Sequence, residues 1–255
     1  MTSLSSNPKE RAYGRFTAQM ALDIAAPHTW PAAILPVAVA TSLAIATGYQ
    51  VSATLAVVLL AICILMQSSV NTFNDYYDYV KGTDSSEDDV DPTDAVLIYN
   101  NVNPRSALLF AIALLISAFV LGGYVIYHAG LIPLAIGAVG AVFVVLYSAG
   151  KTPISYLPLG EAVSGIVMGG LIPLACYQVL TGVLTPLAML WALPEILGIG
   201  LIMCTNNTCD IEKDIVAHRR TLSVLLNREK ARTLYHAILW LWLIAVILIV
   251  GVFFT

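Results

Sequence analysis

Seven apolar runs, each long enough to cross a bilayer, constrain this sequence more than any other feature. A membrane-spanning helix needs about 20 predominantly apolar residues. The runs cover approximately residues 29–47, 53–71, 107–126, 131–147, 160–180, 187–205 and 233–254. Only 11% of the residues are charged, whereas a soluble domain carries about 25%. The sequence therefore predicts an all-α integral membrane protein, a multi-pass transmembrane bundle of about seven helices.

The basic residues indicate how this bundle lies in the membrane. All 12 Lys and Arg residues fall on one side of the predicted topology, and none falls in the short loops after the first, third and fifth runs. Because positive residues mark the cytoplasmic side, we expect a cytoplasmic N-terminus in a bacterial inner (plasma) membrane. Residues 1–24 are expected to form a cytoplasmic tail, and residues 25–255 a single transmembrane domain. Membrane lipid is an expected partner, and nucleic acid is not.

Two polar stretches interrupt the apolar sequence, each at the end of a predicted helix. The first contains Asn71, Asn74, Asp75 and Asp78, and the second contains Asn206, Asn207, Asp210 and Asp214. Residues three and four positions apart share one face of a helix, so each stretch is expected to form a single polar stripe. Both stripes fall on the predicted cytoplasmic side. Carboxylates near a bilayer are costly and indicate a functional site.

The carboxylates of the two stripes are suited to a divalent metal. Four clustered carboxylates would repel one another and raise each other's pKa. Mg²⁺ prefers oxygen ligands and binds one or two carboxylates together with a substrate phosphate. We therefore predict magnesium ligands at Asp75, Asp78, Asp210 and Asp214, which would hold a diphosphate leaving group. Basic side chains near these stripes are expected to meet the phosphate oxygens: Lys81, Lys151, Arg219 and Arg220.

Simpler interpretations exist for several of these residues. The aspartates could be ordinary charges at helix ends, although an acidic residue at a helix C-terminus opposes the helix dipole. The nearby aromatic residues could stabilise a carbocation or anchor helices at the membrane interface. Glu161 is expected at the start of the fifth helix, where a negative charge suits the helix N-terminus. Glu195 lies within the sixth apolar run, and its role stays open.

These motifs resemble those of the UbiA-type intramembrane prenyltransferases. The stretch from Asn71 to Asp78 is similar to the first aspartate-rich motif of that family, and the stretch from Asn206 to Asp214 is similar to the second. The spacing of Tyr147 and Lys151 resembles a further family motif. The residues that follow the two motifs resemble those of the 1,4-dihydroxy-2-naphthoate polyprenyltransferases of menaquinone biosynthesis.

The resemblance implies a magnesium-dependent transfer of a polyprenyl group from a polyprenyl diphosphate donor to an aromatic acceptor. On this basis the four aspartates bind magnesium, and Lys151 takes part in catalysis with them. The implied substrate-binding residues are Asn71, Asn74, Lys81, Tyr147, Asn206, Asn207, Arg219 and Arg220. The acceptor is expected to be 1,4-dihydroxy-2-naphthoate, with 4-hydroxybenzoate, homogentisate, a tetrapyrrole or a glycerol phosphate as alternatives.

The sequence departs from the family in two respects. Family members usually have nine transmembrane helices, and only seven apolar runs are present here. Many relatives also carry a basic segment after the first motif, whereas residues 91–99 contain no positive charge. A cation carrier and a membrane scaffold therefore stay open as alternatives to an enzyme. A carrier would place its carboxylates near the middle of the membrane, a position that only Glu195 suits.

Overall fold

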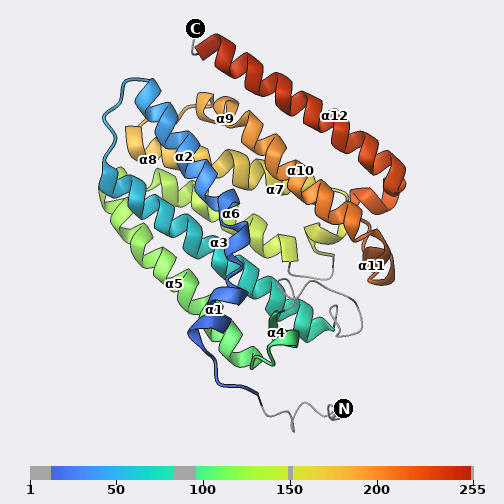
Figure 1. Ribbon diagram of the computed structural model, residues 1–255. Coiled ribbons are helices and arrows are strands. Elements are labelled where there is room, and N and C mark those ends of the chain that lie inside the picture. Colours follow the sequence, from blue (N-terminus) through green and yellow to red (C-terminus); the bar gives the residue numbers. More distant parts are fainter. Residues whose placement is uncertain (1–12, 83–95, 149–151, 254–255) are drawn as a thin grey trace, which may run out of the picture. The chain divides into compact units, whose positions relative to one another are not determined.

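The computed structural model describes residues 13–82, 96–148 and 152–253, and these residues form helices and connecting turns (Figure 1). The predicted all-α fold is confirmed. The chain divides into two compact units. Unit 1 comprises Met1–Trp30 and Leu65–Ser117, and unit 2 comprises Pro31–Ile64 and Ala118–Thr255. Two long helices, α3 (Ala53–Lys81) and α5 (Pro104–Ala129), contribute residues to both units.

Unit 1 has a small apolar core built around the N-terminal helix α1 (Ala18–Ile24). Ile24 packs with residues of the short helix α4 (Val96–Tyr99) and with Ala107 of α5. Thr17 caps α1, because its hydroxyl accepts a hydrogen bond from the backbone N–H of Met20. Residues 18–24, which fall within the predicted cytoplasmic tail, are thus part of a folded unit.

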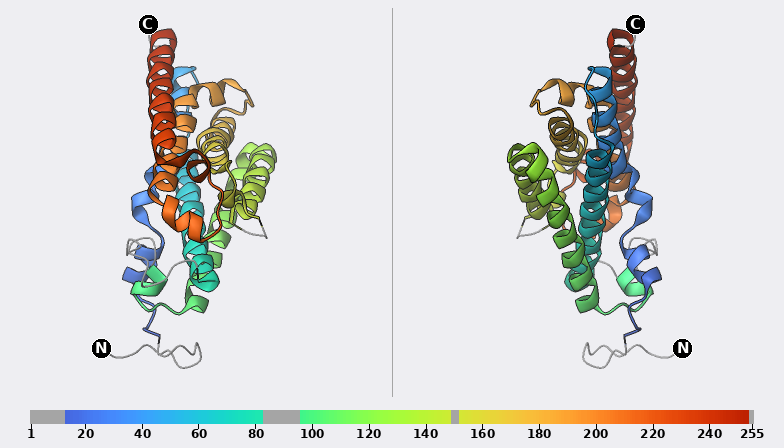
Figure 2. Two further views of the ribbon diagram at one scale, coloured as in Figure 1. Left: turned by 90° about the vertical axis from the view of Figure 1, so that its right-hand side faces the viewer. Right: turned by 90° about the vertical axis from the view of Figure 1, so that its left-hand side faces the viewer.

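Unit 2 contains the remaining helices. These are α2 (Pro31–Ala46), α6 (Ile132–Ser148), α7 (Gly160–Ile166), α8 (Ile172–Thr181), α9 (Leu187–Trp191), α10 (Leu193–Cys209), α11 (Ile211–Val216) and α12 (Leu222–Phe253). A 3₁₀ turn, η2 (Ile154–Tyr156), precedes α7, and a π-helical segment, η3 (Val167–Leu171), joins α7 to α8. Figures 1 and 2 show α12 lying along α10, while α2 packs against α8 and α7 against α10.

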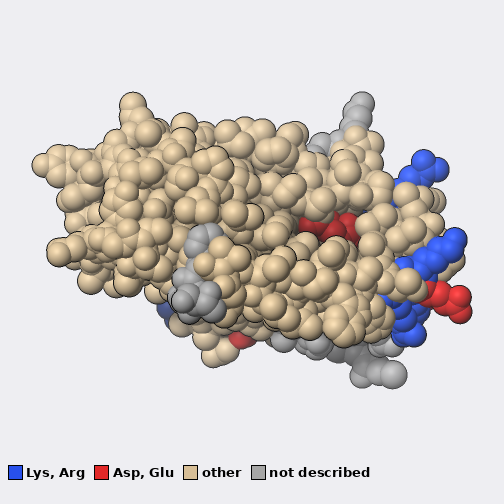
Figure 3. Space-filling view, turned by 90° about the horizontal axis from the view of Figure 1, so that it is seen from above, with Lys and Arg blue, Asp and Glu red and all other residues tan. Residues whose placement is uncertain are grey.

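Apolar and polar groups lie at different places in unit 2. Its apolar core is built from α2, α8, α9 and the first half of α3, with Leu43, Leu59 and Cys176 among the buried residues. The described Lys and Arg residues of unit 2 all fall between Lys213 and Arg232. In Figure 3 most of the visible Lys and Arg side chains lie at the right-hand edge, and most of the visible surface carries no charged residue.

Glycines allow α7 and η3 to pack closely against α10. Gly165 and Gly169 face the backbone of Ile196, and a Cβ atom added to Gly169 would lie 2.6 Å from the Ile196 Cα. Small residues four positions apart are typical of close helix packing in membranes. The contact fixes α10, which leads into the second aspartate motif.

The expected number of seven membrane-length helices is corrected. Within the described residues, four helices are long and apolar enough to cross a membrane, or five if the bent pair formed by residues 18–29 and 31–46 is one span. The sixth apolar run is broken at Ala192 into α9 and α10, one residue before Leu193-Pro194. Proline lacks a backbone N–H and cannot continue a helical hydrogen-bond ladder. The chain is nevertheless a multi-pass integral membrane protein, as predicted.

Candidate active site

The first aspartate motif lies within the last turns of α3, as its spacing predicts. Asn71, Asn74, Asp75 and Asp78 are all helical, and Asp75 is 8% exposed. Phe73 and Tyr77 stack at a centroid distance of 6.4 Å on the same segment. Lys81 is the last residue of α3, and its side chain lies outside the described part of the structure.

Asn71 ties α3 to the N-terminal segment of unit 1. Its Nδ2 donates to the Thr29 hydroxyl at 2.7 Å and to the Ala25 carbonyl at 3.1 Å. Its Oδ1 accepts from Gln67 at 3.2 Å. Ala26 follows with a left-handed backbone (φ 50°), a conformation that L-residues adopt at some cost. The Asn71 side chain therefore holds this turn in place beside the motif.

The second motif does not lie on one continuous helix, since its residues are divided between α10 and α11. Helix α10 ends at Cys209, and Asp210 separates it from α11. The backbone N–H of Asp214 still donates to the Asp210 carbonyl at 2.8 Å, so the helical spacing persists across the break. Asp210 and Asn206 are exposed, whereas Asp214 is buried at 2% exposure.

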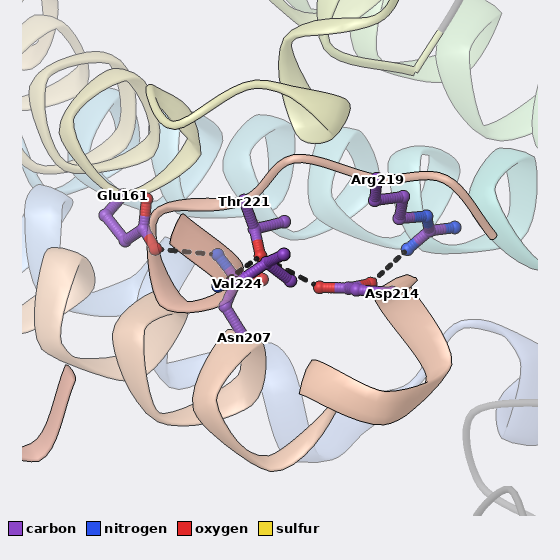
Figure 4. A network of polar contacts seen from close by, with 6 residues as sticks. All are labelled: Glu161, Asn207, Asp214, Arg219, Thr221 and Val224. Carbon is purple, nitrogen blue, oxygen red and sulfur yellow. Dashed lines mark hydrogen bonds and ion pairs between the residues drawn. The ribbon is translucent and has the colours of Figure 1, made fainter. Parts of the chain in front are cut away.

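Asp214 is at the centre of a polar network in unit 2 (Figure 4). Its Oδ2 accepts from the Thr221 hydroxyl at 3.0 Å, and its Oδ1 lies 3.6 Å from the Arg219 guanidinium. Burial raises the pKa of the Asp214 carboxyl above its ordinary value, while Thr221 and Arg219 act in the opposite direction. A buried carboxylate whose charge is costly favours a bound cation, and its oxygen atoms are the donors that Mg²⁺ prefers.

The loop between α11 and α12 lies against η2. The Arg219 guanidinium stands over the Tyr156 ring, 5.0 Å from its centroid. The backbone N–H of Arg220 donates to the Tyr156 carbonyl at 2.8 Å. Arg220 itself is exposed. Arg219 and Arg220, two of the predicted phosphate-binding residues, thus lie shortly after the second motif in the sequence. Both contact Tyr156 in the turn that precedes α7.

Asn207 contacts a carboxylate that the sequence did not single out as a site residue. Its Nδ2 donates to Glu161 Oε1 at 2.8 Å, which links α10 to the start of α7 (Figure 4). Glu161 is 7% exposed. Tyr147 of α6 lies close by, since a Cβ atom on Gly160 would lie 3.4 Å from its hydroxyl. The sequence feature that could have identified Glu161 as a site residue is its position inside an apolar run.

The described residues contain no group of three His, Cys, Asp or Glu side chains that could hold a metal ion. The first motif belongs to unit 1 and the second to unit 2, and each supplies two of the predicted carboxylates. Lys151 and the acidic residues between 84 and 94 lie outside the described residues. The four metal ligands therefore stay a prediction.

Glu195 lies in the first turn of α10, directly after Pro194. An acidic residue is favoured there because the helix dipole is positive at its N-terminus. Its backbone lies against Gly169, since a Cβ atom on that glycine would lie 2.8 Å from the Glu195 carbonyl carbon. Both carboxylate oxygens of Glu195 are nevertheless buried without a hydrogen-bond partner among the described residues, so the helix dipole alone does not explain this residue.

Comparison with known proteins identifies relatives along most of the chain. Residues 33–255 match the model of the UbiA prenyltransferase family. The chain is 30% identical over 233 residues to the 1,4-dihydroxy-2-naphthoate octaprenyltransferase of Bacillus subtilis (strain 168), covering 90% of this chain and 74% of that protein. It is 27% identical to the human UbiA prenyltransferase domain-containing protein 1, covering 84% of this chain and 63% of the relative.

Solved structures with the same fold come from an archaeal relative. The structure of a UbiA homolog from Archaeoglobus fulgidus bound to DMAPP and Mg²⁺ superposes with a TM-score of 0.66 at 17% identity, covering 89% of this chain and 76% of that one. The same homolog bound to GPP and Mg²⁺ gives a TM-score of 0.65. At this identity the likeness concerns the fold.

Proposed function

Because the chain belongs to the UbiA prenyltransferase family, we propose that it transfers a polyprenyl group from a polyprenyl diphosphate to an aromatic acceptor in the membrane. The observation that carries the proposal is the network around Asp214, in which a buried carboxylate lies beside Arg219 and Thr221. The carboxylate favours a cation and the guanidinium favours an anionic ligand, and both belong to a chain with at least four apolar helices of membrane-spanning length among its described residues.

The proposed magnesium ligands are the aspartates of both motifs. Asp75 and Asp78 would come from α3, and Asp210 and Asp214 from the segment after α10. Bound magnesium would neutralise the charge that develops on the diphosphate as it leaves. Arg219, Arg220 and Lys151 would bind the phosphate oxygens, and arginine can do so through two parallel hydrogen bonds.

The reaction exchanges one bond for another. The bond between the allylic carbon and the diphosphate oxygen breaks, and its electron pair leaves with the diphosphate. A ring carbon of the acceptor forms the new carbon–carbon bond. The acceptor then loses the substituent at that carbon, either a proton or, from a carboxylated carbon, carbon dioxide. Apolar helix faces around the site would accommodate the polyprenyl chain, since they exclude water from it.

The proposed acceptor is 1,4-dihydroxy-2-naphthoate, which would place the protein in menaquinone biosynthesis. This choice of acceptor is supported by the 30% identity to the 1,4-dihydroxy-2-naphthoate octaprenyltransferase of Bacillus subtilis. We further propose that the site faces the cytoplasm of a bacterial plasma membrane. The support is the distribution of Lys and Arg, which the positive-inside rule assigns to the cytoplasmic side.

A transfer assay with purified protein tests the proposal. The protein is incubated with magnesium, a polyprenyl diphosphate and 1,4-dihydroxy-2-naphthoate, and the prenylated naphthoquinone is measured. Asp75→Ala and Asp210→Ala are each expected to reduce the rate by roughly 100-fold or more, the scale on which loss of one charge-stabilising group acts. Glu212→Ala is the matched control, because Glu212 is an exposed acidic residue of α11. No product with the wild type, or full activity in both variants, would refute the proposal.

A further inference from the structure

A second polar cluster lies beside the Asp214 network, between α6, α7 and α10. The Tyr147 hydroxyl and the Asn207 amide approach each other across Gly160. A Cβ atom on that glycine would lie 3.4 Å from the Tyr147 hydroxyl and 4.0 Å from Asn207 Nδ2. Polar side chains of α6 and α10 thus meet at the start of α7, where Asn207 is also hydrogen-bonded to Glu161 (Figure 4).

Glu161 has one carboxylate oxygen that no hydrogen bond satisfies. Its Oε1 accepts from Asn207 at 2.8 Å, whereas Oε2 is buried and has no hydrogen-bond partner among the described residues. The residue as a whole is only 7% exposed. Buried polar atoms nearly always find a partner, and leaving one unmet is costly. Oε2 is therefore suited to accept a hydrogen bond from a ligand.

The chemistry of the proposed substrates identifies the group that can donate this bond. A diphosphate is anionic, and a carboxylate oxygen repels it. The polyprenyl chain carries no hydrogen-bond donor. A hydroxyl group on the aromatic acceptor is the donor that this reaction brings to the protein. The cluster adjoins the second motif, because Asn207 of that motif donates its hydrogen bond to Glu161.

We propose that Glu161 binds the aromatic acceptor by accepting a hydrogen bond from its ring hydroxyl through Oε2. Asn207 holds the carboxylate in position from α10. Glu161 is thereby a specificity-determining residue, which favours hydroxylated rings over rings of the same size without a hydroxyl group. The inference rests on the proposed function, since it names the group that recognises the acceptor.

A binding experiment with two matched ligands tests the inference without requiring turnover. Equilibrium binding to purified protein is measured for 4-hydroxy-2-naphthoate and for 2-naphthoate, which lacks the hydroxyl. The wild type should bind the hydroxylated ligand roughly 10- to 100-fold more tightly, the range of a hydrogen bond to a charged group. Glu161→Gln should weaken this preference, because its amide oxygen can still accept from Asn207 while its N–H groups can only donate to the ring hydroxyl, so the bond to a charged acceptor is lost. Glu212→Gln, on the exposed face of α11, should retain it.

Transfer kinetics separate this inference from the proposed function. With an active wild type, Glu161→Gln should raise the KM for the acceptor and leave the KM for the polyprenyl diphosphate unchanged. An unchanged ligand preference in Glu161→Gln would overturn the inference while leaving the prenyl transfer intact. An inactive wild type that still prefers the hydroxylated ligand through Glu161 would overturn only the proposed function. If Glu161→Gln does not fold, equal binding of the two ligands by the wild type is sufficient to overturn the inference.

Discussion

Adding one methyl group at Gly169 should separate two helices of unit 2. The Cβ of Gly169→Ala would lie 2.6 Å from both the backbone N and the Cα of Ile196. This is about 0.8 Å short of ordinary van der Waals contact, and the atoms that it meets belong to a helix backbone that cannot rotate away. Overpacking of this kind typically costs about 1–3 kcal/mol, which corresponds to a fall in Tm of roughly 2–12 °C for a chain of this size.

The neighbouring Gly170 provides a matched control. A Cβ atom there would lie 3.1 Å from the terminal methyl of Met189, and a methionine side chain can move aside at little cost. Both glycines are buried in η3, so the two variants differ mainly in what the new methyl group contacts. Gly170→Ala should therefore have a Tm close to that of the wild type.

Separation of η3 from α10 in Gly169→Ala should also reduce activity, because α10 positions Asn207 and Asp210. A displacement of about 1 Å at a reacting group can lower a rate by roughly 100-fold. Thermal unfolding in detergent and the transfer assay measure the two effects on the same samples. Equal Tm values and equal rates for Gly169→Ala and Gly170→Ala would refute the packing argument.

Three further predictions concern individual contacts. Thr221→Val removes the hydroxyl that donates to Asp214 at 3.0 Å and should cost about 1.5–3 kcal/mol in stability. Thr221→Ser keeps the hydroxyl and should have a stability close to that of the wild type. Equal thermal unfolding of the two variants would contradict this prediction. Asn71→Asp replaces the donor that reaches Thr29 at 2.7 Å and should lower the Tm, and an unchanged Tm would show that this contact is not needed for stability. Cys209 is the exposed cysteine among the four, so a membrane-impermeant maleimide should label it in inside-out vesicles and not in right-side-out cells. Cys209→Ser is the control for labelling at other positions. The reverse labelling pattern would contradict the proposed orientation.

The sequence was sufficient to predict the helical membrane fold and the place of the first motif. The length of apolar sequence that crosses a bilayer is set mainly by bilayer thickness, and the spacing from Asn71 to Asp78 fits one unbroken helix. The break at Asp210 and the π-helical segment η3 were not predictable in the same way, because each depends on contacts with other helices. The close approach of Gly169 to α10 is such a contact.

Glu161 shows why part of the candidate site was missed. Its position at the start of a helix accounts for an acidic residue by the dipole alone, and no motif spacing links it to Asn207, 46 positions along the chain. Only the folded unit brings the two side chains to 2.8 Å and buries Glu161. Asn71 presents the converse case, since a residue expected to bind substrate is hydrogen-bonded to Ala25 and Thr29.

Magnesium-dependent binding of a donor analogue is the most direct test of the central claim that both aspartate motifs bind the diphosphate. A polyprenyl thiodiphosphate, which resists cleavage, is titrated onto the protein with and without magnesium. The wild type should bind only with magnesium, and Asp75→Asn and Asp210→Asn should each weaken binding by roughly 10-fold or more, while Glu212→Gln should not. Binding that is independent of magnesium, or that survives unchanged in both aspartate variants, would contradict the account.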